Sequence, residues 1–261
     1  KFSTTDVGWD FPPYGKGFPG WHIECSTMSR KYLGQPFDIH TGGIDHIPIH
    51  HQNEIAQSEA AYGVPLAKVW MHNEHLVVPS GKMAKSGENF ITLKTLTDRG
   101  IHPLAYRYYL LQAYYRSPIQ FSWSALEAAQ NGYFKALLAF SSNTSTMSAV
   151  IPAKAGIQEL FDDLNTPAVL TFLWKALKEK NRATVFDCDK ILGLDIENQS
   201  KKLLEEMNAV SETIKNLSAA REDARRAKDF KKSDKFREEI RAAGFEVMDT
   251  DQGPLIRKSR H

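Results

Sequence analysis

Cysteine is scarce in this chain of 261 residues, which contains only Cys25 and Cys188. Two cysteines are too few for a disulfide framework, so the sequence favours a reducing compartment. Long hydrophobic runs are missing as well, because no apolar stretch approaches the ~20 residues that a membrane helix needs. These absences exclude a membrane-spanning helix, and we expect a cytoplasmic chain with no membrane partner.

An excess of charge of one sign is also absent. The 33 Lys and Arg residues nearly balance the 31 Asp and Glu residues, which gives a formal net charge of +2. This balance excludes a general polycation but leaves local basic patches open. Histidine is nearly missing from the second part of the chain: eight of the nine lie at or before His102, and the other is His261. Since imidazole binds metals and titrates near neutral pH, we expect the chemistry in the first part.

The chain begins with Lys1 rather than Met, and a stretch rich in Gly, Pro and Trp follows over residues 8–20. No clear helix or strand signal precedes this stretch. We therefore expect that the chain is a truncated piece of a longer protein.

Strand and helix signals alternate over the first hundred residues. Residues 36–40 are typical of a short buried strand, residues 50–62 of a helix that ends at Gly63, and residues 69–78 of a second strand. A further helix is expected over residues 23–32. Strand, helix and strand in this order predict a parallel α/β unit.

From Pro103 onward the hydrophobic pattern becomes helical. Residues 141–149 are rich in Ser and Thr and are the best candidate linker. The predicted fold class is α/β followed by a mostly α-helical part, with boundaries at 1–102, 103–140 and 141–261. The expected elements are helices over 104–115, 124–140 (N-cap Ser124), 167–178 (cap Thr166), 201–227 and 231–243, and a hairpin over 245–257.

One candidate metal site combines Cys25 with His50 and Glu54. His50 and Glu54 are four residues apart on the predicted helix, so both side chains project from one face. With a thiolate from Cys25 they make a mixed S, N and O set that Zn²⁺ accepts. The pattern also fits a surface ion pair and a buried cysteine that acts as a small hydrophobe. His51 is turned about 100° from His50 and lines a pocket or lies on the surface.

Two loops carry candidate ligand-binding residues. Gly42, Gly43 and Asp45 follow a predicted strand, where open parallel sheets bind ligands, although the same residues suit an ordinary turn. Lys82 and Lys85 lie in a glycine-bounded loop that suits a polyphosphate, although a solvated basic loop has the same pattern.

The helical region has a modest basic excess over residues 219–241, where nine basic residues face six acids. A solvated helix face and a surface that follows phosphates both fit this pattern. The nine residues are Arg221, Arg225, Arg226, Lys228, Lys231, Lys232, Lys235, Arg237 and Arg241.

Taken in order, these motifs resemble the cysteinyl-tRNA synthetase family, which belongs to the class I aminoacyl-tRNA synthetases. The resemblance covers essentially the whole chain. It is carried by residues 20–26 (GWHIECS), 38–45 (DIHTGGID), 50–59 (HHQNEIAQSE), 82–86 (KMAKS, similar to the KMSKS signature), 163–167 (DLNTP) and the tail over 224–257.

The resemblance implies a role for each matching residue. Cys25, His50 and Glu54 match three of the family's four ligands to Zn²⁺, which takes the thiolate of substrate cysteine. Trp21 and His40 match the wall of the amino-acid pocket. Gly42, Gly43 and Asp45 would lie against the adenosine of ATP, which binds with Mg²⁺. Lys85 would bind ATP as well, with Lys82 as a second catalytic phosphate neighbour.

The implied reaction activates L-cysteine with ATP and transfers it to tRNA-Cys. The implied architecture is the second part of a Rossmann-like catalytic domain over 1–102, a connecting helical region over 103–140 and a DALR-like tRNA-binding domain over 141–261. We expect a monomer.

The sequence also departs from the family pattern. The His-x-Gly-His signature and a cysteine as fourth zinc ligand are not found, so we expect the chain alone to be inactive. Ala84 and Thr41 replace a usual Ser and Gly. Two alternatives stay open: a cysteine ligase of the mycothiol pathway, which needs no tRNA surface, and a non-catalytic tRNA-binding relic.

Overall fold

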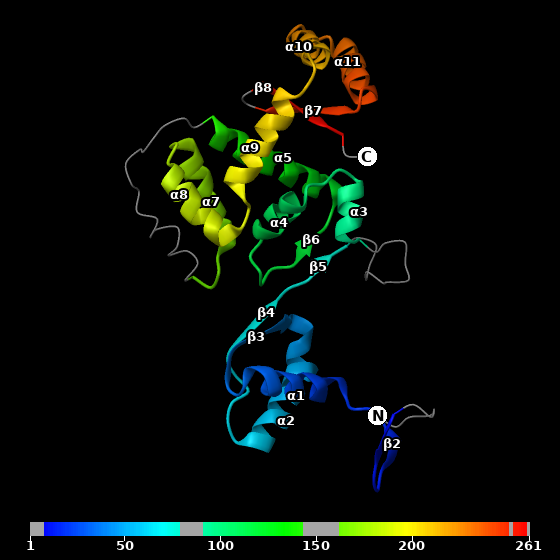
Figure 1. The fold of residues 1–261 in the computed structure, drawn as a ribbon, viewed down its shortest axis with the longest axis vertical. Helices are drawn as coiled ribbons and strands as arrows, with labels where there is room; N and C mark the ends of the chain where they lie inside the picture. The colour runs from blue at the N-terminus through cyan, green and yellow to red at the C-terminus, as the bar shows by residue number, and fades with distance from the viewer. Residues whose placement is uncertain (1–7, 79–90, 143–161, 251–252, 260–261) are drawn as a thin grey trace. The chain divides into compact units, whose positions relative to one another are not determined.

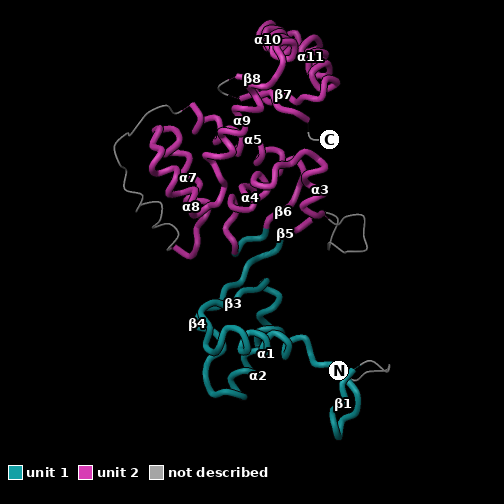
Figure 2. The backbone as a smooth tube through the Cα atoms, viewed as in Figure 1, with its two compact units in different colours: residues 1–75, 116–118 teal, residues 76–115, 119–261 magenta. Residues whose placement is uncertain are grey.

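A computed structural model describes residues 8–78, 91–142, 162–250 and 253–259 of the chain (Figure 1). The chain divides into two compact units (Figure 2). Unit 1 comprises Lys1–His75 and Arg116–Pro118, and unit 2 comprises Leu76–Tyr115 and Ile119–His261.

Unit 1 contains a parallel pair of strands with helices between them. In this pair β3 lies beside β4, with Phe37 opposite Ala67 and Gly43 opposite Asn73. The strand–helix–strand prediction is therefore confirmed, and the α/β class with it. The elements of unit 1 are β1 (Trp9–Phe11), β2 (Gly15–Gly17), α1 (Trp21–Leu33), β3 (Phe37–Gly43), η1 (Ile44–His46), η2 (Ile47–His51), α2 (Gln52–Tyr62) and β4 (Ala67–Asn73).

The helix expected to begin at His50 begins later, at Gln52. The preceding segment η2 is a π-helical turn that starts close to Pro48, whose ring removes a backbone N–H donor. A wide turn of this kind changes which side chains face inward, and both His50 and His51 are buried. The strand expected over 69–78 is also shorter than predicted: β4 begins at Ala67 and ends at Asn73.

Unit 2 is built on a helical core. Its largest cluster of buried side chains includes Tyr133, Leu173 and Leu192 from three different helices. The sequence did not predict the helices over Leu93–Asp98 and Arg182–Leu192. The N-cap of the helix that begins at Trp123 is Ser122 rather than Ser124, and that of the helix that begins at Thr166 is Asn165 rather than Thr166. This part contains α3 (Leu93–Asp98), α4 (Pro103–Leu111), α5 (Trp123–Ser141), α7 (Thr166–Lys178), α8 (Arg182–Leu192) and α9 (Ile196–Asn208), with β5 (Leu76–Val77) parallel to β6 (Ile119–Gln120).

The end of unit 2 is a helical pair packed on a hairpin. The single helix expected over 201–227 was wrong, because the chain leaves α9 after Asn208 and restarts as α10 (Glu212–Arg226). Val210 is buried at this break. The predicted hairpin is confirmed as β7 (Phe245–Thr250) antiparallel to β8 (Gly253–Lys258), after α11 (Phe230–Ala242).

No helix within the described ranges is long and apolar enough to cross a membrane. The start of the expected linker, residues 141–142, belongs to the end of α5 and its cap, and the rest of it lies outside the described residues.

A buried arginine holds α10 against the hairpin. Arg221 is only 1% exposed, and its guanidinium donates two hydrogen bonds, of 2.7 and 3.0 Å, to the carboxylate of Asp249 on β7. This arginine, counted above among the basic residues of a phosphate-binding surface, is therefore a structural residue. The hydrogen bonds from Arg221 lower the pKa of Asp249 below its usual range.

Asp249→Asn is expected to weaken the packing of α10 on β7 because Arg221 keeps its ion pair with Glu222 but loses its charged partner on β7. The loss should be about 1–2 kcal/mol, since the Asp249 side chain is 40% exposed and partly screened. Hydrogen exchange of the α10 and β7 amides measures it. Because the folded pKa of Asp249 is lowered, the difference from wild type should be present above about pH 4 and shrink as the pH falls further.

Glu238→Gln is the matched control, because it removes an exposed ion pair with Arg241 at 2.8 Å. This control substitution should change the opening free energy measured by hydrogen exchange by less than about 0.5 kcal/mol. Equal effects of the two substitutions would contradict the structural role of Arg221.

Candidate metal centre

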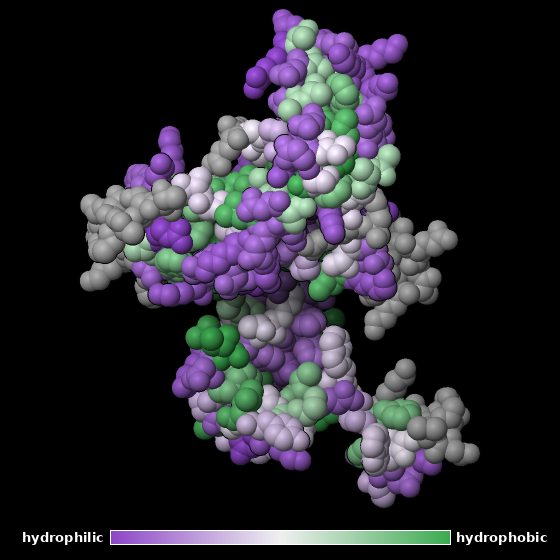
Figure 3. Space-filling view, turned by 45° about the horizontal axis from the view of Figure 1, so that its top comes forward, coloured by the Kyte–Doolittle hydropathy of each residue, from purple (hydrophilic) through white to green (hydrophobic). Residues whose placement is uncertain are grey.

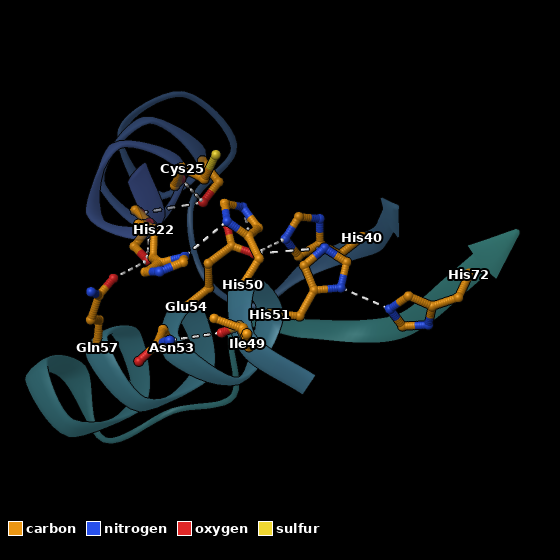
Figure 4. A network of polar contacts seen from close by, with 12 residues as sticks. His22, Cys25, His40, Ile49, His50, His51, Asn53, Glu54, Gln57 and His72 are labelled. Atoms are coloured by element: carbon orange, nitrogen blue, oxygen red, sulfur yellow. Dashed lines mark hydrogen bonds and ion pairs between the residues drawn. The ribbon is translucent and has the colours of Figure 1, made fainter. Parts of the chain in front are cut away.

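The carboxylate of Glu54 is the centre of a cluster of histidines in unit 1 (Figure 4). Glu54 is fully buried on the first turn of α2. Its Oε2 accepts a hydrogen bond of 2.8 Å from Nε2 of His40 on β3. The Nε2 atoms of His50 and His51 lie 3.7 and 3.8 Å from the same oxygen. Three imidazoles therefore surround one buried carboxylate.

The second oxygen of this carboxylate has no hydrogen-bond partner. Oε1 of Glu54 is buried and unpaired among the described residues. An unpaired carboxylate oxygen out of water carries a large desolvation penalty, which a bound cation would offset. The orphaned oxygen makes the site electrostatically suited to a positive ion.

Cys25, His50 and Glu54 come together as the sequence suggested. Their candidate ligand atoms all lie within 4.8 Å of one another. Cys25 comes from α1, His50 from η2 and Glu54 from α2, so three elements supply one donor each. Their role as metal ligands stays a prediction.

A second group shares Glu54. His40, His51 and Glu54 also have ligand atoms within 4.8 Å of one another. Sequence analysis assigned His40 to a pocket wall and left the place of His51 open. The structure places His51 in the interior, only 3% exposed, on the turn that precedes α2.

Partners from other elements orient these imidazoles. Nδ1 of His50 lies 2.9 Å from Nδ1 of His22, and Nδ1 of His51 lies 2.7 Å from Nε2 of His72. Sequence reasoning missed both His22 and His72. His22 stands in the GWHIECS motif, whereas the density of histidine in this part of the chain was the signal for His72. Neither pointed to contact with η2, because α1 and β4 are remote from η2 in sequence.

Burial keeps the donors of the site uncharged. Desolvation lowers the pKa of His51 to about 4, and it also lowers the pKa of His50. Burial and the nearby Glu54 carboxylate raise the pKa of the Cys25 thiol. The imidazoles therefore offer lone pairs at neutral pH, whereas the Cys25 thiol must lose a proton before it can bind a metal.

The Trp21 ring lies against the cluster, with its centroid 4.1 Å from that of His50. The indole is half exposed, so it covers the histidine and keeps one side open to solvent. The position suits the predicted pocket wall, and that role stays a prediction. Lys82 and Lys85 lie outside the described residues.

Gly42 and Gly43 end β3, and Asp45 follows in η1, at the carboxyl end of the strand as expected. A Cβ on Gly42 would stand 2.7 Å from Nδ1 of His46 and from Cε1 of His51. Glycine is therefore required here because the backbone packs directly on the imidazoles. Asp45 is exposed and lies 3.3 Å from Nε2 of His75.

Gly42→Ala is expected to displace the His51 ring and break its contact with His72, because His51 is buried and has no free space. The stability of unit 1 should fall by about 1–3 kcal/mol. NMR of the imidazole nitrogens and thermal unfolding measure both effects. Gly20→Ala is the control, since a Cβ there meets nothing within 4 Å. Unchanged imidazole signals in Gly42→Ala would contradict the packing argument.

Two family models match the chain. The catalytic domain of class I (C) tRNA synthetases matches residues 1–131, and the anticodon-binding domain of cysteinyl-tRNA ligases matches residues 207–257. Among solved structures, a LeuRS from Agrobacterium radiobacter in a ternary complex with tRNA is similar in fold. Its TM-score is 0.53 at 14% identity, over 74% of this chain and 33% of that one.

Curated relatives are similar over nearly the whole chain. Cysteine–tRNA ligase 1 of Burkholderia lata is 42% identical and the alignment covers 98% of this chain, and the Thermus thermophilus ligase is 41% identical over 95%. The chain spans 56% and 57% of those two proteins. Since a catalytic-domain model matches just over half of its length, the chain belongs to the cysteinyl-tRNA synthetase family.

Proposed function

We propose that the protein to which this chain belongs is a cysteine–tRNA ligase, which activates L-cysteine with ATP and transfers it to tRNA-Cys. The single observation that carries the proposal is the convergence of Cys25, His50 and the orphaned Glu54 carboxylate on one point. Family membership supplies the reaction class. The sulfur and imidazole donors supply a reason for cysteine as the amino acid.

We infer that Cys25, His50 and Glu54 hold Zn²⁺. Thiolate, imidazole and carboxylate are the three ligand types that zinc uses in proteins, and three protein ligands leave a position open. The bound zinc would accept the thiolate of substrate cysteine and so reject serine, whose hydroxyl is a poor counterpart. The free state of both Cys25 and Cys188 suits the cytoplasm that the sequence predicts.

The chain's own residues would position the substrates. His40 donates its Nε2 proton to Glu54 and so fixes the carboxylate. Trp21 covers His50 and forms a wall beside the place for the amino acid. Gly42, Gly43 and Asp45, at the carboxyl end of β3, are the candidates to lie against the adenosine of ATP. Lys82 and Lys85 are the candidates to neutralise the phosphates, together with Mg²⁺.

Glu54→Gln is expected to lower the affinity for zinc at least ~100-fold, because the amide lacks the negative charge that the buried site needs. Zinc content after dialysis measures it. Glu59→Gln on the exposed face of α2 is the control and should bind zinc like wild type.

The cobalt-loaded chain tests the amino acid. Cysteine should strengthen the absorption band from sulfur to cobalt, whereas serine should leave it unchanged. Undiminished zinc binding by the Glu54→Gln variant, or an equal response of the cobalt-loaded chain to serine, would contradict the proposal.

We further infer that tRNA contacts the connection between α10 and α11. In the part of the chain that the structure describes, exposed Arg226, Lys228, Lys231 and Lys232 form no ion pair. Arg221 and Arg225 instead bind Asp249. Figure 3 shows hydrophilic side chains along the edge of this helical pair. Unpaired cations on one edge are what a phosphate backbone requires.

A double substitution of Lys231 and Lys232 by Ala should weaken tRNA binding and reduce the slope of log K against log salt by about 1–2, because each phosphate contact releases counterions. A salt titration of tRNA binding by the chain measures this. Lys190→Ala is the control, since Lys190 is paired with Asp187 at 3.0 Å on α8. A chain that binds no tRNA but retains zinc would favour the cysteine ligase of the mycothiol pathway instead.

A further inference from the structure

The group His40, His51 and Glu54 lies beside the Cys25 group and uses different nitrogen donors. It contains no sulfur. Two imidazoles and one carboxylate are the donor set of His₂Glu zinc centres and of the facial triads that bind Fe²⁺. The group therefore offers three ligands, of which His40 and His51 are its own and Glu54 is shared with the Cys25 group.

In this group one contact with Glu54 is a hydrogen bond, from His40, and the other, from His51, is not. Nε2 of His51 is 3.8 Å from Oε2 of Glu54, which is too long for a hydrogen bond, although both atoms are buried. Ligands bonded to a tetrahedral zinc ion lie about 3.4 Å apart. The distance from Oε2 of Glu54 to Nε2 of His40, 2.8 Å, is shorter than this value, and the distance to Nε2 of His51, 3.8 Å, is longer.

The surroundings also orient His51 as metal ligands are oriented. Its other ring nitrogen, Nδ1, is held by His72 at 2.7 Å, and a metal-binding histidine usually has such a partner on the opposite nitrogen. Trp70 packs on both rings, with its centroid 4.6 Å from that of His40 and 5.0 Å from that of His51. The two imidazoles are thus fixed before any ion binds.

We propose that His40, His51 and Glu54 form a second site for a divalent first-row transition-metal ion. The site does not need Cys25, so the inference goes beyond the proposed function. His40 and His51 of this group and His50 of the other group all lie nearest to Oε2 of Glu54, whose second oxygen, Oε1, is unpaired among the described residues. For His40 to coordinate through Nε2, the ring must carry its proton on Nδ1 instead, which replaces the hydrogen bond to Glu54 by a bond to the ion.

The test uses Co²⁺ and the full chain with Cys25→Ala, which removes the sulfur donor. This variant should still bind one equivalent of Co²⁺, with visible bands but no sulfur-to-cobalt charge-transfer band. Adding His51→Ala or, separately, His40→Asn should abolish that equivalent. His40 is partly exposed, so its replacement tests the site even if the loss of buried His51 disturbs folding.

His75→Ala added to Cys25→Ala is the matched control, since the exposed His75 belongs to neither group. It should retain the equivalent. The proposal is overturned if Cys25→Ala binds no Co²⁺, or if the ion it binds survives the loss of both His51 and His40.

His51→Ala alone separates this inference from the zinc site. That variant should retain the charge-transfer band of Cys25, because His50, Cys25 and Glu54 are intact. Both sites are supported if the charge-transfer band is lost in Cys25→Ala but not in His51→Ala, and if Cys25→Ala still binds one equivalent of Co²⁺. Absence of the band from wild type, with the histidine-dependent equivalent present, would overturn the zinc site and leave the second site standing.

Discussion

The buried carboxylate of Glu54 is the constraint on which unit 1 depends. A charged group with no exposure to water is tolerated only where neighbours compensate it, and here the neighbours are imidazoles from β3 and η2. Each of those imidazoles in turn needs a partner or a wall, which His22, His72 and Trp70 supply. The polar network thus extends from one carboxylate to four elements of the unit.

The local part of this network could be predicted from the sequence, and the non-local part could not. The four-residue spacing of His50 and Glu54 placed them on one face, and their atoms do approach to 3.7 Å. The role of His51 depended on the π-helical turn, which no hydrophobic period predicts. His22 and His72 come from remote elements, so only the fold brings them into contact.

The same division holds for the helical unit. Long apolar periods located α5 and α7 correctly, because burial of one face determines those helices. The break after Asn208 was missed, although Val210 is buried at the turn and Ser211, in extended backbone, is the N-cap residue of α10. Arg221 was assigned to the surface by composition, whereas its partner Asp249 lies 28 residues away on β7.

Apolar packing contributes little to holding the metal-type donors in place. The buried apolar cluster of unit 1 has only Phe37, Leu66 and Ala67 at its centre. Ile39 and Val69, on the two parallel strands, are more than half exposed. Parallel strands are ordinarily covered on both faces. With so small a core, the free energy that orders Cys25, His50 and Glu54 must come largely from the polar network. The proposed binding of a metal ion would therefore be coupled to the folding of unit 1, because the same side chains that offer donors also hold α1, β3 and α2 together.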